Sequence, residues 1–277
     1  MPLVAIGDNV LDCYVDRGLM FPGGNSVNVA VSAARSGSTA AYVGVVGDDE
    51  RGEVVTAALR AEGVAVTRLR TRPGPTAYAV VRHLDGDRVF GPNDKGVSLF
   101  EPTSTDLDFV AGFDLAHSSY CSGLESWLPA LAFRTRLSFD FDQRTGAYAE
   151  DLLPHTWAAT FSGSGLTRSE CEDLARWAAA RGPARVFVTR GARGALAYDG
   201  RVWHCSARPV DVVDSLGAGD AFIGRALHGL LAGEPTEALL SAAVEAGTRA
   251  CTTWGGFGHG RPLSPDLPLP AEAVRRT

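Results

Sequence analysis

Short apolar runs alternate with amphipathic segments along most of this chain, and this alternation is the strongest constraint on its fold. The expected strands are largely apolar and occupy residues 4–7, 40–46, 137–141, 157–162 and 186–189. The expected helices have apolar residues at helical spacing and occupy residues 28–36, 50–61, about 167–181, 218–232 and about 236–252. This order predicts an α/β fold in which βαβ units build a central, mostly parallel sheet flanked by helices.

Local signals support these boundaries. Thr167 and Glu170 have the spacing of a capping box, which predicts that a helix starts there. Asp199-Gly200 predicts the tight turn of a hairpin between residues 195–198 and 201–204. The whole chain, residues 1–277, is expected to form a single domain, because neither a repeat nor a low-complexity linker interrupts it.

Two segments depart from the αβ alternation. Residues 12–22 and 76–91 are expected to form β ribbons, and Asp85-Gly86 should turn the second. We interpret them as a small β lid at the edge of the domain, although two ordinary edge hairpins without a gating role would give the same pattern. The tail from about Arg261 contains four prolines, so we expect it to be loosely packed.

Composition excludes several classes of protein. The net charge is −6 and no long basic run occurs, which argues against nucleic acid or an anionic membrane as a partner. The five cysteines show no C-x-x-C spacing, so we expect reduced thiols rather than a zinc site or a disulfide framework. The N-terminus does not resemble a signal peptide and no apolar run could span a bilayer. We therefore expect a cytoplasmic protein.

The most informative segment is V-D-S-L-G-A-G-D-A-F at residues 213–222. A strand is expected to end near Asp214, followed by a glycine turn and the start of a helix. Backbone N–H groups at a helix start bind anions, and Gly217 and Gly219 let a ligand approach the backbone closely. Asp220 lies in the first turn, where it could accept a proton from a hydroxyl. Positioning, charge neutralisation and a base are what phosphoryl transfer needs, although Asp214 and Asp220 could also merely cap the helix. A Walker P-loop motif does not occur in the sequence.

A second glycine-rich segment, F-P-G-G-N-S-V-N-V-A, occupies residues 21–30. Gly23 and Gly24 permit close approach of a ligand, and Asn25 and Asn28 stand at the start of a helix. Asp8 and Asp12 follow the first strand, so carboxylates and amides could together hold sugar hydroxyls. The alternative for Asn25 or Ser26 is a simple helix N-cap.

The two segments closely resemble, in this order and separation, the two motifs of pfkB-type carbohydrate kinases. The resemblance rests on Gly23-Gly24 with Asn28 and on Asp214 with Gly217-Ala218-Gly219-Asp220. It implies a ribokinase-like fold with a β lid over the sugar and with MgATP along a groove. It also implies that Asp220 is the catalytic base, that the N–H groups of 217–220 form an anion hole, and that Asp12, Gly24 and Asn28 bind the sugar.

Further segments are similar to the family's nucleotide-binding motifs. Thr189, Gly191 and Gly194 match the T-x-G-x-x-G turn that touches ATP phosphates. Residues 139–144 are similar to D-x-N-x-R, with Asp142 where asparagine is usual and with Arg144 as a phosphate ligand by position.

The family's N-x-x-E stretch corresponds to residues 162–165, but here the glutamate that orders magnesium-bound water is absent. Glu170 or Glu172 could substitute, the phosphates could hold magnesium, or the segment could be a plain loop that keeps only Ser162 near ATP. Many relatives also bind potassium beside the anion hole, which implies a site at Asp214 and the Leu216 backbone.

Residues 5–12, 23–31 and 87–91, the last with Arg88 in the lid, resemble the fructoselysine 6-kinase subgroup. That subgroup phosphorylates the 6-hydroxyl of an Amadori compound, whose amine would suit Asp8 and Asp12, with Asp94 or Glu101 as further candidates. The alternatives are a kinase for a ketose, ribose or nucleoside, or a non-catalytic sugar sensor. A nucleoside would need a stacking slot, which the aromatic residues near the lid could supply: Tyr14, Phe21 and Tyr78. We also expect that the lid could support a homodimer.

Overall fold

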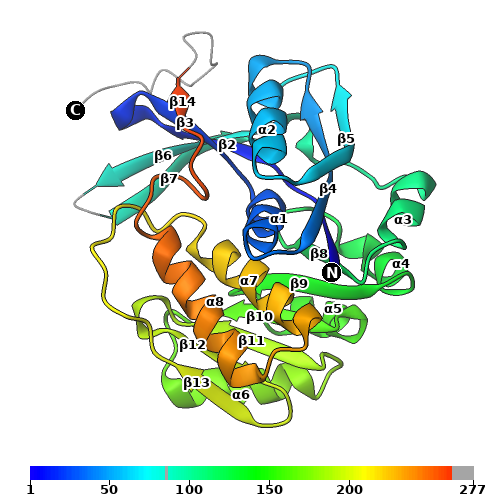
Figure 1. Ribbon diagram of the computed structural model, residues 1–277, viewed down its shortest axis with the longest axis vertical. Helices are drawn as coiled ribbons and strands as arrows, with labels where there is room; N and C mark the ends of the chain where they lie inside the picture. Colours follow the sequence, from blue (N-terminus) through cyan, green and yellow to red (C-terminus); the bar gives the residue numbers. More distant parts are fainter. Residues whose placement is uncertain (85–86, 264–277) are drawn as a thin grey trace.

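A nine-stranded sheet forms the centre of the molecule (Figure 1). The computed structural model describes residues 1–84 and 87–263, without the side chains of residues 83, 84 and 87–90. The strand order is β13-β12-β11-β10-β9-β8-β1-β4-β5, parallel from β5 to β11 and antiparallel at β12 and β13. The bounds are β1 Pro2–Ile6, β4 Thr39–Gly47, β5 Ala65–Arg72, β8 Leu115–Ser119, β9 Arg136–Asp142, β10 Ala158–Ser162, β11 Arg185–Thr189, β12 Ala195–Tyr198 and β13 Val202–Cys205. The expected α/β architecture is confirmed.

Helices cover both faces of this sheet. The bounds are α1 Asn25–Arg35, α2 Glu50–Ala61, α3 Ser104–Val110, α4 Leu128–Ala132, α5 Ala147–Leu152, α6 Arg168–Ala179, α7 Ala218–Ala232 and α8 Thr236–Ala250. In β1, Val4 and Ile6 pack with the core beneath α3–α6, whereas Leu3 and Ala5 pack beneath α1, α2, α7 and α8. Because neighbouring residues of a strand face opposite sides, a strand covered on both faces is apolar throughout, which is the pattern that the sequence shows.

The expected capping box of α6 and the expected β12–β13 hairpin are both present. The expectation that a strand ends near Asp214 is wrong: residues 206–217 form neither helix nor strand. Buried hydrogen bonds of the Asp214 carboxylate hold this loop instead. Helix α1 also begins at Asn25 rather than at residue 28, because Asp8 supplies acceptors to its first N–H groups.

The two expected ribbons join into one smaller sheet, the lid, at the upper left of Figure 1. Its order is β14-β3-β2-β6-β7, and its strands are β2 Val10–Tyr14, β3 Leu19–Gly23, β6 Tyr78–Leu84, β7 Asp87–Asp94 and β14 Arg261–Pro262. The distant ribbons meet where β2 runs parallel to β6. The expected turn at residues 85–86 lies outside the described residues.

The first residues of the tail that was expected to be loosely packed make defined contacts. Arg261 and Pro262 pair with β3, and the Leu263 N–H donates to the Gly18 carbonyl. This start of the tail is therefore docked on the lid, and residues 264–277 lie outside the described part of the chain. Within the described residues, no helix has the length and apolarity that crossing a membrane requires.

Candidate active site

A cleft of about 1190 Å³ lies between the lid and the ends of the central strands. Most of the residues that the sequence assigned to substrate, phosphate or cation line it: Asp8, Asp12, Gly24, Asn25, Asn28, Ser162, Thr189, Gly191, Gly194, Leu216, Gly217, Ala218, Gly219 and Asp220. Gly23, Arg144 and Asp214 are not among the lining residues, and the side chain of Arg88 lies outside the described ones. The carboxyl ends of parallel strands meet at one edge of a sheet, which is why segments far apart in sequence converge here.

Asp220 occupies the first turn of α7, and two amides hold its carboxylate. Asn25 Nδ2 donates to Oδ1 at 2.8 Å, and Asn28 Nδ2 donates to Oδ2 at 2.6 Å. Gly217 precedes the helix at φ 74°, and a Cβ there would lie 2.6 Å from the Gly256 Cα. Only glycine fits this conformation and this approach, so the turn can present the first N–H groups of α7 to the cleft.

Asp8 performs a structural task that the sequence did not show. Its Oδ1 accepts hydrogen bonds from the N–H and hydroxyl groups of Ser26 and from the hydroxyls of Ser119 and Ser122. In the described part of the chain its Oδ2 accepts one, from the Asn25 N–H at 2.8 Å. A carboxylate beside the first turn of a helix satisfies its unpaired donors and interacts favourably with its dipole. Asp8, rather than Asn25 or Ser26, therefore caps α1.

The sugar side of the cleft offers buried polar atoms. Asp12, on β2, is 4% exposed, and a Cβ on Gly23 would lie 2.4 Å from its Oδ2, so Gly23 makes room for this carboxylate. Among the described residues, Asn28 Oδ1 and Asn9 Oδ1 are buried acceptors without a hydrogen-bond partner. Buried acceptors are costly unless a ligand pairs with them. Asn9 was not identified from the sequence, although it directly follows Asp8.

Two further polar residues, Asp140 and His117, contact Asn25. Asn25 Nδ2 also donates to Asp140 Oδ2 at 2.8 Å, and Asn25 Oδ1 lies 3.0 Å from His117 Nε2. Burial is the main cause that raises the pKa of Asp140 to about 7, and the charges of Asp220 and Asp142 add to it. The hydrogen bond from the Asp142 N–H acts in the opposite direction and lowers this pKa. Burial lowers the pKa of His117 to about 3, so its ring is neutral. Asp140 belongs to the D-x-N-x-R stretch, but no sequence signal marked His117.

Asp142 and Arg144 complete that stretch. Asp142 has φ 51°, in the left-handed region where asparagine and aspartate are tolerated better than most residues. This conformation explains how aspartate can stand where asparagine is usual. Arg144 stacks on the Tyr120 ring, 3.8 Å from its centroid, and its Nη1 lies 3.5 Å from Asp142 Oδ2.

The opposite end of the cleft suits a nucleotide. Thr189, Gly191 and Gly194 lie there, after β11, and apolar residues line the remainder: Val210, Val212, Phe222, Ile223 and Val244. Apolar walls suit a base, and the start of α7 suits phosphates. The residues present therefore fit ATP.

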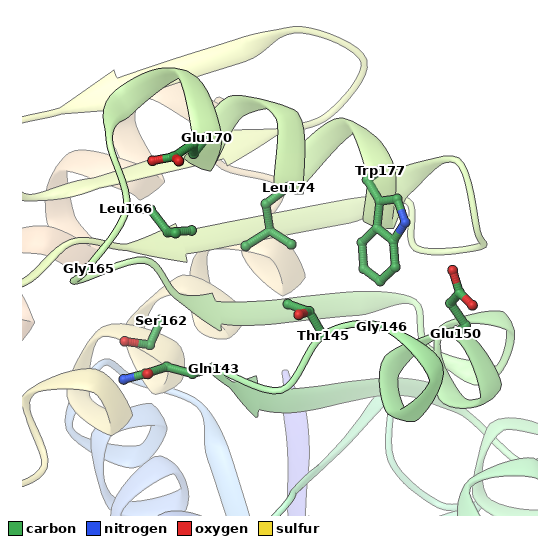
Figure 2. Close-up of a pocket in the computed structure, with 10 residues that line it drawn as sticks. All are labelled: Gln143, Thr145, Gly146, Glu150, Ser162, Gly165, Leu166, Glu170, Leu174 and Trp177. Atoms are coloured by element: carbon green, nitrogen blue, oxygen red, sulfur yellow. The ribbon is translucent and has the colours of Figure 1, made fainter.

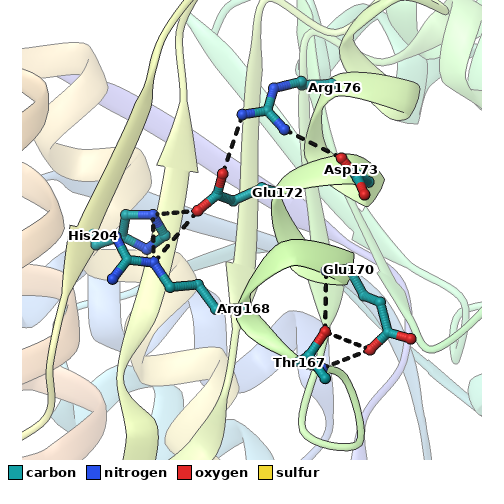
Figure 3. Close-up of polar contacts among 7 residues, drawn as sticks. All are labelled: Thr167, Arg168, Glu170, Glu172, Asp173, Arg176 and His204. Carbon is teal, nitrogen blue, oxygen red and sulfur yellow. Dashed lines mark hydrogen bonds and ion pairs between the residues drawn. The ribbon is translucent and has the colours of Figure 1, made fainter.

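Magnesium has no dedicated cluster of ligands in the described residues, where no group of three or more His, Cys, Asp or Glu side chains is arranged to hold a metal ion. A smaller cavity of about 510 Å³ lies beside Ser162 and Gly165, where the family's glutamate is absent (Figure 2). Glu170 borders it, but its carboxylate accepts from Thr167 in the capping box. Glu172 lies near Arg168, Arg176 and His204 (Figure 3). Glu172 is thus engaged by these partners, whereas Glu170 borders the cavity with one carboxylate oxygen held in the capping box. Phosphate oxygens and water would supply most of the magnesium ligands.

Asp214 is 2% exposed and accepts from the Tyr14 hydroxyl at 2.5 Å and from the Leu216 and Gly255 N–H groups, each at 3.0 Å.

Tyr14 packs edge-on against Phe21 with ring centroids 5.2 Å apart. Neither ring lines the cleft, whereas Tyr78 does. The stacking slot that a nucleoside would need is therefore not assembled from these three residues.

Comparisons with known proteins agree with this geometry. Residues 2–257 match the model of the pfkB family carbohydrate kinases. The chain belongs to this family. It is 38% identical to fructosamine kinase FrlD of Bacillus subtilis over 273 residues, which cover 95% of each chain. It is 35% identical to fructoselysine 6-kinase of Escherichia coli over 235 residues, which cover 83% of this kinase and 90% of the relative.

The fold is also shared with solved structures. The structure of Arabidopsis thaliana ribokinase complexed with ribose and ATP matches with a TM-score of 0.81 and 20% identity, covering 92% of this kinase and 94% of that chain. The expected ribokinase-like fold is thus confirmed. The chain is a carbohydrate kinase, a phosphotransferase that uses ATP to phosphorylate a sugar. The non-catalytic alternative is not favoured.

Proposed function

We propose that this kinase phosphorylates the 6-hydroxyl of fructoselysine or a related fructosamine, with Asp220 as the general base. The observation that carries the proposal is the position of Asp220. Its carboxylate lies at the start of α7, beside the anion-binding N–H groups and within reach of the sugar side of the cleft. The names and identities of the two relatives support the acceptor, since both act on sugars joined to an amine.

The amides of Asn25 and Asn28 fix the Asp220 carboxylate, so that a lone pair can face an incoming hydroxyl. Asp220 accepts the hydroxyl proton as the oxygen attacks. The N–H groups of Gly217, Ala218, Gly219 and Asp220 stabilise the charge on the transferred group. Bound MgATP supplies the phosphoryl group, and Thr189, Gly191, Gly194, Ser162 and Arg144 are proposed to orient its phosphates.

The sugar is proposed to bind Asp12, Gly23, Gly24 and Asn28, with Arg88 of the lid as a further contact. Asn28 Oδ1 is well suited, because it is buried and unpaired in the described structure and can accept from a sugar hydroxyl. The substrate's amine is proposed to meet Asp8 Oδ2, the less occupied oxygen of a carboxylate that lines the cleft. Asp94 and Glu101, the other candidates, are not among the lining residues described.

Replacing the base tests the mechanism. Asp220→Asn keeps the shape of the side chain but removes the proton acceptor, so kcat should fall by roughly 10²–10⁴-fold. ATP binding, measured by calorimetry, should remain near that of the wild type. Turnover at a near wild-type rate would show that Asp220 is not the base.

Substrate preference tests the acceptor. A partly buried charged hydrogen bond is worth about 1.5–3 kcal/mol, or roughly ten- to 150-fold in kcat/KM. We therefore expect fructoselysine to exceed fructose in kcat/KM by at least about tenfold. Equal values for the two sugars on the wild type would contradict the proposed acceptor.

Two variants then locate the charge recognition. Asp8→Asn should lower kcat/KM for both sugars by weakening the cap of α1, and should lower it further for the charged substrate, so that the preference shrinks. Asp12→Asn should lower kcat/KM for both sugars. If Asp8→Asn lowers kcat/KM equally for the two sugars, Asp8 only caps α1 and another group binds the amine.

We also propose modest stimulation by potassium, held by Asp214 and the Leu216 backbone. The effect should be small, because three donors already engage the Asp214 carboxylate and order the loop before α7. Initial rates in equimolar potassium, sodium and tetramethylammonium chloride measure it. Identical rates in all three would rule the site out.

The lid is proposed to close over the sugar and to pair two copies of the chain as a homodimer. Its strands form a sheet separate from the central one, which supports a surface able to move or pair as a unit. Analytical ultracentrifugation should give a dimer mass at micromolar protein. A monomer across that range would contradict the pairing without affecting the catalytic proposal.

A further inference from the structure

A hydrogen-bonded network links Asp220 to two residues that the proposed mechanism does not assign to the sugar or to ATP. It joins the start of α1, the start of α7, β8 and β9 through the Asn25 side chain. We propose that His117 and Asp140 are positioning residues, which act through Asn25 to fix the orientation and the proton affinity of Asp220. This inference rests on the proposed role of Asp220 as the base.

His117 determines which way the Asn25 amide points. The ring is fully buried and neutral, so one ring nitrogen carries a proton and the other accepts one. Its Nδ1 lies 3.1 Å from the Ser138 hydroxyl, which can donate to it, so Nε2 keeps the proton and donates to Asn25 Oδ1. The amide NH₂ group of Asn25 must then face the two carboxylates. Without this donor, the amide could flip and place its oxygen against them.

The NH₂ group divides its two protons between Asp140 and Asp220, each at 2.8 Å. The Asp140 carboxylate is fixed on its other side, because its Oδ1 accepts from the Asp142 N–H at 3.0 Å. When it is ionised, Asp140 therefore holds a second negative charge, one amide away from the proposed base. A nearby charge of like sign favours the protonated form of a carboxylate, so an ionised Asp140 makes Asp220 a stronger base.

Other titratable groups lie around this pair. Asp142 ends β9 and forms an ion pair with Arg144 in the loop that follows, and Asp8 lies beyond Asn25, after β1. After β8, burial raises the pKa of Tyr120, and burial with the charge of Asp8 raises that of Cys121 to about 12, so both stay neutral. Lys95 is an exposed cation that lines the cleft and acts on Cys121. With the pKa of Asp140 at about 7, its charge state changes within the working pH range.

The first test is the pH profile of Asp140→Asn. We expect kcat at pH 8, where Asp140 is ionised, to fall roughly three- to tenfold, and the rise of kcat/KM near pH 7 that accompanies this ionisation to disappear. KM for ATP should change little. Asp151→Asn, a charge removal at the exposed end of α5, should leave the profile in place. A rise near pH 7 that persists unchanged in Asp140→Asn would overturn the inference.

A second test separates positioning from folding. His117→Phe removes the donor to Asn25 and should lower kcat more than KM, whereas His117→Gln retains a donor and should recover part of the loss. If both variants lose activity only in proportion to their loss of thermal stability, His117 is a structural residue and the inference is wrong.

A third readout does not need catalysis. A carboxyl whose pKa is raised on folding binds its proton more tightly in the folded state, so its contribution to stability is present at low pH and is lost as the pH rises towards 7. The melting temperature of the wild type should therefore fall between pH 5 and pH 8 relative to that of Asp140→Asn. Parallel curves would contradict the assignment. If Asp220→Asn is inactive while Asp140→Asn keeps the activity and pH profile of the wild type, this inference is wrong and the proposed function still holds.

Discussion

The Asp8 carboxylate at the start of α1 is the interaction on which the rest of the site depends. It joins the end of β1 to the first turn of the helix, to Ser119 at the end of β8 and to Ser122 in the loop that follows. This contact fixes where α1 begins, and α1 carries both amides that hold Asp220. A Cβ on Gly24 would lie 2.7 Å from the Asn9 Cα, so the close approach of strand and helix also requires glycine there. Backbone geometry and one buried carboxylate thus set the position of Asp220, the proposed base.

The remaining geometry follows from the strands that surround β1. His117 lies on β8, which is next to β1 in the sheet, and Asp140 lies near the end of β9, which is next to β8, so both reach the same amide as Asp220. The lid adds Asp12, and its inner residue Tyr14 bonds to Asp214 in the loop before α7. Sugar side and phosphate side are thereby tied together by two short polar connections, one through Asn25 and one through Tyr14.

Much of the architecture was predictable, because parallel strands buried on both faces must be apolar and their helices must be amphipathic. The α6 capping box was predictable from Thr167 and Glu170 alone, since its contacts are local. The strand expected near Asp214 was wrong for the opposite reason. Val212 and Val213 look like strand residues, but both are exposed, and long-range bonds from Tyr14 and Gly255 hold the loop that follows them.

The sequence by itself determined the family, the glycine turn before α7, the carboxylate in the first turn and the two asparagines of α1, because each depends on residue types at short spacing. Tertiary structure alone decided which partners Glu170 and Glu172 contact, that Asp8 caps α1, and that His117 and Asp140 meet Asn25. These facts depend on contacts across up to 115 positions of the chain, as between Asn25 and Asp140. Only the packing of strands into a sheet brings such residues together, and burial there sets the protonation of Asp140 and His117.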